Sequence, residues 1–85
     1  MASTNRTTVE LRVEIETDAD RAALEQALLR ARAAELAELR RLDVRLSAGY
    51  GDATTRASMA DQAASARRRW TMLDRLLTAL RGTTG

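Results

Sequence analysis

The C-terminal half of the chain carries an apolar repeat whose members are spaced alternately by four and three residues. The repeat consists of Met59, Ala63, Ala66, Trp70, Leu73, Leu77 and Leu80. Because an α-helix completes a turn about every 3.6 residues, this spacing places all the members on one face of a helix. We therefore predict a helix at about residues 54–81 whose apolar seam must pack against a second apolar surface.

A leucine stripe of the same kind lies earlier in the chain, at about residues 19–48. Its members are Leu24, Leu28, Leu39, Leu42 and Leu46, and Leu29 and Leu36 widen the stripe on one side. Thr17 and Asp18 suit the start of a helix, and Gly49 suits its end. The chain thus contains two predicted helices separated by a short break.

The break between the predicted helices reads Gly49-Tyr50-Gly51-Asp52. A connection this short predicts that the helices fold back on each other as an antiparallel hairpin. Pairing them about Gly51 sets leucines of one helix opposite alanines of the other, as in close-packed layers. We expect the seam to contain Leu28, Leu39, Leu42, Met59, Trp70, Leu73, Leu77 and Leu80.

Trp70 is the largest side chain of this seam, and the pairing sets it opposite residues 31–34. A buried indole usually finds a hydrogen-bond acceptor, so we predict that its N–H bonds Glu35. Arg32 and Glu35 are three residues apart and could themselves pair. They form either a polar layer that sets the register of the helices or a solvated edge of the stripe.

Residues 8–16 alternate strictly between apolar and polar side chains. Val9, Leu11, Val13 and Ile15 fall on one face, and Glu10, Arg12, Glu14 and Glu16 fall on the other. Alternation with a period of two and β-branched residues predicts a half-buried β-strand. No other segment of the chain has this pattern, so the strand has no partner within the same chain.

The unpaired strand and the wide apolar arcs of the helices together predict assembly with a second chain. The predicted fold is mainly α: one domain at residues 1–85, with an N-terminal strand followed by a long antiparallel helical hairpin. We expect a homodimer in which two strands form an antiparallel ribbon on a four-helix bundle, with Val9, Leu11, Val13 and Ile15 at the interface. The alternative is a heterologous protein that accepts the strand into its own sheet.

The composition argues against catalysis. The chain has no histidine and no cysteine, so it lacks the usual general base, the commonest metal ligand and any thiolate. We predict no enzyme activity, no cofactor and no metal site. The chain begins without the apolar stretch of a signal peptide and has no run of about 18 apolar residues, which predicts a cytoplasmic protein without a membrane span.

All 14 basic residues are arginines, and several gather on the second predicted helix. Arg67, Arg68 and Arg75 are candidate contacts for a partner or for nucleic acid. Asp61 and Asp74 interrupt this stripe, however, so a solvated face is the favoured interpretation. Tyr50, between two glycines, is either a partner contact or a residue that packs the loop.

The order of a strand and two helices is similar to that of ribbon-helix-helix repressors, which read DNA with a dimeric ribbon. Here the helices are about twice as long, and the polar face of the strand carries three glutamates that DNA phosphates would repel. The sequence therefore favours a non-enzymatic interaction or assembly module, such as an adaptor, an assembly chaperone or a component of a phage or defence system. The alternative is a small dimeric nucleic-acid-binding regulator, or an antitoxin-like protein, that uses its arginine-rich second helix.

Overall fold

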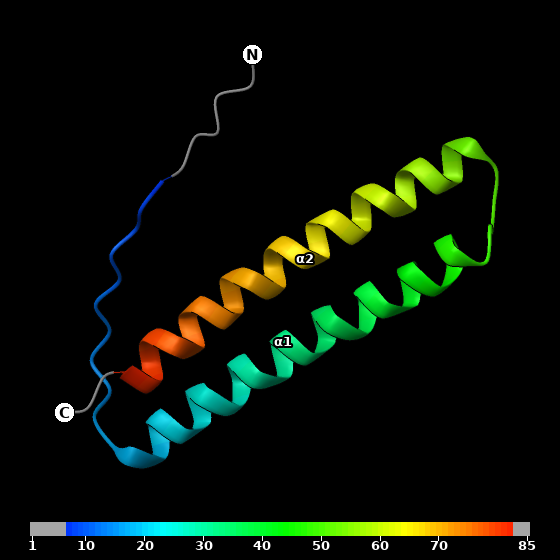
Figure 1. Cartoon of the computed structure of the whole chain (residues 1–85). Helices are drawn as coiled ribbons and strands as arrows, with labels where there is room; N and C mark the ends of the chain where they lie inside the picture. Colours follow the sequence, from blue (N-terminus) through cyan, green and yellow to red (C-terminus); the bar gives the residue numbers. More distant parts are fainter. Residues whose placement is uncertain (1–6, 83–85) are drawn as a thin grey trace.

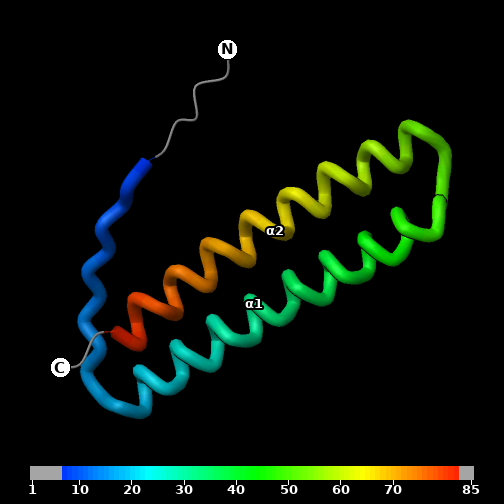
Figure 2. The backbone as a smooth tube through the Cα atoms, viewed as in Figure 1, coloured from blue at the N-terminus to red at the C-terminus, as the bar shows by residue number. Residues whose placement is uncertain are grey.

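Two long helices lying side by side form the body of the molecule (Figure 1). The structure, a computed structural model, describes residues 7–82. Helix α1 spans Asp18–Ser47 and helix α2 spans Ala53–Gly82. They run antiparallel and stay close along their length, as the trace in Figure 2 shows. The predicted mainly α fold with a helical hairpin is confirmed.

Short polar side chains begin both helices. Thr17 Oγ1 accepts a hydrogen bond from the backbone N–H of Asp20 at 3.1 Å, which caps α1. Asp52 Oδ1 accepts one from the backbone N–H of Thr55 at 2.8 Å, and this bond lowers the pKa of Asp52. Each helix therefore starts where a side chain satisfies an N–H group that has no carbonyl partner within the helix.

Two glycines turn the chain from α1 into α2. Gly49 has a φ of +71° and Gly51 a φ of +85°, in the left-handed region that disfavours side chains. At Gly51 a Cβ atom would also lie 2.8 Å from Cγ2 of Thr55. The N–H of Tyr50 donates to the carbonyl of Arg45 at 3.0 Å and so ties the turn to the end of α1.

The apolar core lies where the two helices meet. Among the described residues the buried ones are Leu42, Met59, Ala63, Ala66 and Leu77. Leu39 and Leu46 pack against this core at the end near the turn. The other predicted seam residues are half-buried, namely Leu28, Leu39, Trp70, Leu73 and Leu80. The core is small because the hairpin is a single layer of helices, so each helix keeps a large solvent-facing surface.

Arginines join the two helices by ion pairs at several levels. The pairs are Glu35 with Arg69 at 2.8 Å, Arg32 with Asp74 at 2.5 Å, and Glu25 with Arg81 at 2.6 Å. They lie beside the apolar core and leave their side chains partly exposed. Because water screens such pairs, each contributes little free energy, and their main effect is to favour one register of the helices.

The predicted hydrogen bond from Trp70 to Glu35 does not form in the described part of the chain. The Glu35 carboxylate instead accepts hydrogen bonds from Nε of Arg69 at 2.8 and 2.9 Å. A charged donor binds a carboxylate more strongly than the neutral indole does, which explains the difference. Trp70 is half-buried, and the guanidinium carbon of Arg32 lies 5.6 Å from the centre of its ring.

The strand predicted at residues 8–16 is absent from the described residues 7–82 of this single chain. Residues 7–16 instead form an extended segment, which we call the N-terminal segment. It leaves the start of α1 and passes the C-terminal end of α2 (Figure 1). A strand requires a neighbour for its backbone groups, and within the described part no other segment supplies one.

Candidate interaction surfaces

The N-terminal segment presents its apolar side chains to solvent. Val9 is 66% exposed, Leu11 71% and Val13 73%, and we call these three residues the aliphatic row. No backbone hydrogen bond within residues 7–82 involves residues 7–16. A row of aliphatic side chains beside unpaired backbone groups has the chemistry of an edge strand that is ready to pair.

The end of this segment nearest α1 rests on the hairpin. Ile15 is half-buried, and it lines an open groove of about 660 Å³ together with Leu24 and Leu80. At the same end, Nη2 of Arg21 donates to the carbonyl of Leu80 at 2.5 Å and joins α1 to α2. Leu11 and Val13 line the same groove but stay mostly exposed, so the exposed fractions divide the predicted strand interface into the half-buried Ile15 and the exposed aliphatic row.

One edge of the hairpin is apolar near its open end. We call it the alanine edge; it consists of Ala27, Ala31, Ala34, Met72 and Leu76. The alanines are exposed, Met72 is 53% exposed and Leu76 is 36% exposed. Helical spacing places the α1 members in line with Glu38 and the α2 members in line with Arg69, and these two residues line one shallow groove. The members from the two helices therefore lie toward the same side of the hairpin.

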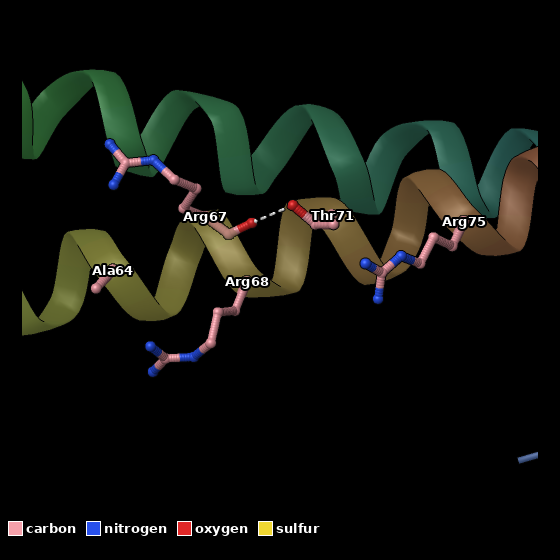
Figure 3. A pocket seen from close by; sticks show the side chains of 5 residues that line it. All are labelled: Ala64, Arg67, Arg68, Thr71 and Arg75. Carbon is pink, nitrogen blue, oxygen red and sulfur yellow. Dashed lines mark hydrogen bonds between the residues drawn. The ribbon is translucent and has the colours of Figure 1, made fainter. Parts of the chain in front are cut away.

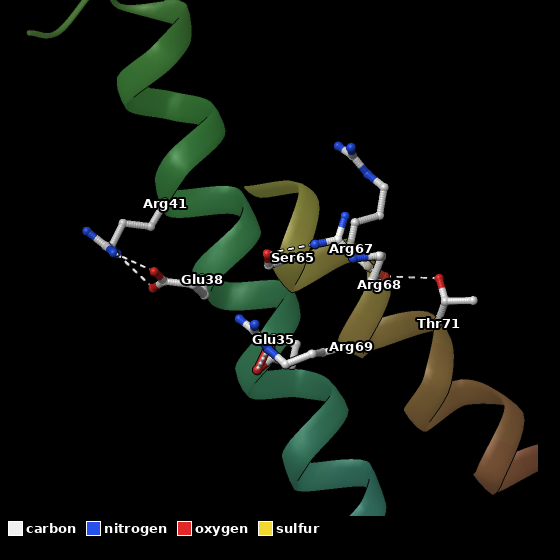
Figure 4. Close-up of polar contacts among 8 residues, drawn as sticks. All are labelled: Glu35, Glu38, Arg41, Ser65, Arg67, Arg68, Arg69 and Thr71. Carbon is white, nitrogen blue, oxygen red and sulfur yellow. Dashed lines mark hydrogen bonds and ion pairs between the residues drawn. The ribbon is translucent and has the colours of Figure 1, made fainter. Parts of the chain in front are cut away.

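The arginine run of α2 is divided between two faces. Arg69 turns toward α1 and binds Glu35, whereas Arg68 bonds Ser65 of its own helix (Figure 4). Also in Figure 4, Arg41 donates two hydrogen bonds to Glu38, and these lower the pKa of Glu38. The ion pair of Arg69 agrees with the seam spacing, which places Arg69 at the edge of the seam, one residue before Trp70.

Arg67, Arg68 and Arg75 share the outer face of α2, and we call them the arginine face. With Ala64 and Thr71 they line an open groove of about 520 Å³ (Figure 3). Arg68 donates to Ser65 Oγ at 2.9 Å, and Thr71 Oγ1 donates to the carbonyl of Arg67 at 3.0 Å. Among residues 7–82 none of the three arginines forms an ion pair with a carboxylate, so their charges face solvent.

Tyr50 lies in the turn and is 58% exposed. The guanidinium carbon of Arg45 lies 5.4 Å from the centre of its ring, which is a cation–π distance. The ring thus packs on the last turn of α1 with one side and meets solvent with the other. Both interpretations of Tyr50, loop packing and partner contact, agree with this placement.

Residues 7–82 contain no cluster of three or more histidine, cysteine, aspartate or glutamate side chains that could hold a metal ion. Across the same residues, neither helix combines the length and the hydropathy needed to cross a membrane. No protein-family model, curated protein or solved structure matches this chain.

Proposed function

We propose that the chain is a non-enzymatic protein–protein interaction module that works as a homodimer. The N-terminal segment is the observation that carries this proposal. Its aliphatic row is about two-thirds exposed or more, and its backbone makes no hydrogen bonds within residues 7–82. A second chain that pairs with the segment covers the row and satisfies the backbone groups in a single contact.

The size of the core supports the same proposal. Only five of the described residues are buried: Leu42, Met59, Ala63, Ala66 and Leu77. A chain of 85 residues buries little surface by itself. Half-buried leucines such as Leu28 and Leu73 would be covered further by a second hairpin. Assembly therefore supplies apolar burial that the single layer of helices lacks.

The alanine edge gives the second hairpin a place to pack. Small side chains on α1 let another helix approach closely, while Met72 and Leu76 provide bulk that can fill the space between alanines. Two copies joined at this edge form a four-helix bundle. Their N-terminal segments, which leave the same end of each hairpin, then form a two-stranded ribbon.

A module of this kind acts by bringing chains together and needs no chemistry of its own. Adaptors, assembly chaperones and structural components of phage or defence systems work in this way. The alternative is that the N-terminal segment adds to the β-sheet of a different protein. The mass of the purified protein distinguishes this arrangement from the homodimer.

The experiment is a measurement of molar mass by sedimentation equilibrium over a wide range of concentration. We expect a dimer, and we expect Val13→Ser to weaken it because Val13 lies in the aliphatic row. Val44→Ser is the matched control, since Val44 is 68% exposed on α1 and lies outside the row and the alanine edge. A protein that stays monomeric up to about millimolar concentration would contradict the homodimer and leave the heterologous partner.

A second candidate function, nucleic-acid binding, is favoured by the arginine face. Three arginines without carboxylate partners on one side of a helix can neutralise phosphates. The acidic residues of the N-terminal segment oppose this function, so we rank it second. Its test is the salt dependence of binding: contacts to several phosphates weaken steeply as salt rises, whereas an apolar protein interface does not.

A further inference from the structure

We propose that the two N-terminal segments pair antiparallel with Leu11 of one copy directly opposite Leu11 of the other. This inference rests on the proposed homodimer and specifies the direction and register of its ribbon. Two independent observations support it: which apolar side chains are exposed, and which charges the pairing sets opposite one another.

The exposed apolar side chains are centred on Leu11. Val9, Leu11 and Val13 are 66–73% exposed, whereas Ile15 is half-buried. The side chains that remain for a partner are therefore the aliphatic row. A two-fold axis at the middle of the row sets Leu11 opposite its copy and Val9 opposite Val13, so each member meets another.

The charges on the opposite face select the same axis. In an antiparallel pair, residues directly opposite each other lie on the same face of the ribbon. With the axis at Leu11, Arg12 faces Glu10 of the second copy, and symmetry makes this pair twice. Glu14 faces the uncharged Thr8. Within residues 7–15 no two like charges are then directly opposite.

Other registers bring like charges together. An axis at Arg12 sets the two arginines opposite each other and Glu10 opposite Glu14. Moving the axis to Val13 keeps one favourable pair, Arg12 with Glu14, but sets Glu10 opposite Glu16. Parallel strands in register would place every glutamate beside its own copy. Like charges directly opposite destabilise a strand pair, so these arrangements are disfavoured.

Disulfide cross-linking tests this register directly, because the chain has no cysteine of its own. The Cα atoms of opposite residues are about 4.5 or 5.5 Å apart, depending on the type of pair, and a disulfide accepts both distances. Two copies of residue 13 would be displaced by four residues, or about 14 Å, which is too far for a disulfide.

We expect Leu11→Cys to form a covalent dimer under mild oxidation at least about tenfold faster than Val9→Cys or Val13→Cys. A mixture of Val9→Cys and Val13→Cys should cross-link across the pair, although each variant alone does not. Fastest cross-linking of Val13→Cys alone would overturn the register in favour of an axis at Val13. Equal rates for all three variants would also overturn it, because parallel strands give that result.

Charge reversal provides a second test that needs no cysteine. Arg12→Glu sets two glutamates opposite each other at two places, and we expect the Kd of the dimer to rise on the order of tenfold. Adding Glu10→Arg restores both pairs and should return the Kd to within about twofold of the original. Adding Glu14→Arg instead is the matched control: it restores the charge but not the pairing, and rescue by it would overturn the register.

The outcomes also distinguish this inference from the proposed function. A wild-type chain without a dimer overturns both. A dimer that Val13→Ser weakens, but in which Leu11→Cys does not cross-link, retains the homodimer and overturns only the register.

Discussion

Leu76 and Leu77 are adjacent in α2 but differ in their surroundings. Leu77 is 1% exposed and belongs to the core, whereas Leu76 is 36% exposed and belongs to the alanine edge. Changing each leucine to alanine therefore tests the rotation of α2 and the role of the alanine edge with two variants of the same chemistry and the same helix propensity.

The expected losses in the free energy of unfolding follow from the exposed fractions of Leu76 and Leu77. Leucine to alanine removes about three carbon groups, or roughly 2.4 kcal/mol of transfer free energy at 0.8 kcal/mol each. Leu77→Ala also leaves an enclosed cavity, which raises the loss to about 3–4 kcal/mol. At Leu76 about two-thirds of the transfer free energy applies and no closed cavity forms, so we expect about 1.6 kcal/mol in the single chain.

Urea unfolding followed by circular dichroism measures both losses, and it should be repeated at several protein concentrations. In dilute solution, where the chain is monomeric, Leu77→Ala should cost about 2 kcal/mol more than Leu76→Ala. At high concentration the loss from Leu76→Ala should grow, because the proposed dimer covers the alanine edge. Equal losses in dilute solution would refute the rotation assigned to α2, and a concentration-independent Leu76→Ala loss would remove the alanine edge from the interface.

Three further expectations concern single features. Because its pKa is lowered in the fold, the charge of Asp52 stabilises the protein above the ordinary value of 3.8, and this contribution disappears as the pH falls through the lower folded pKa. The Tm difference between the wild type and Asp52→Asn, which keeps a capping acceptor but does not titrate, should accordingly be constant near neutral pH and vanish in acid. Trp70→Ala should cost about 2–3 kcal/mol in urea unfolding, less than a fully buried tryptophan, and iodide should quench the fluorescence of Trp70 only partly. Duplex DNA should bind more weakly than about 1 µM at about 150 mM salt, and sub-micromolar binding that is lost when the arginine face is changed to alanine would promote the nucleic-acid function to first place.

The helical hairpin could be predicted because its signals are local. The spacing of Met59, Ala63 and Trp70 specifies a helical face within a few residues, and the pair of glycines at 49 and 51 specifies where the chain reverses. The structure places both glycines at positive φ, as such a turn requires. Helix length, break and seam therefore follow from short stretches of sequence.

The strand and the polar contacts depend on groups that are distant in the sequence. Alternation at residues 8–16 describes side chains that suit a strand, but the strand itself exists only with a partner, and the single chain has none in its described part. Similarly, spacing brought Trp70 near Glu35 without showing that Arg69 would take the carboxylate. Competition among several donors for one acceptor is decided by charge and side-chain reach, which a periodic pattern does not contain.

The contacts between the helices have a consequence for the order in which the molecule folds. The residues they join are 34 apart for Glu35 and Arg69, 42 for Arg32 and Asp74, and 59 for Arg21 and Leu80. Because closing a longer loop costs more entropy, the contacts between α1 and α2 should form first beside the glycine turn and then successively toward the chain ends.

Opening should proceed in the reverse order. The last contact to close, between Arg21 and Leu80, lies beside the N-terminal segment. Amide hydrogen exchange should accordingly be fastest in the first turns of α1 and the last turns of α2, and slowest near Leu42 and Met59. A partner bound at the N-terminal segment would hold the end that opens first, so association would slow exchange there far more than at the turn.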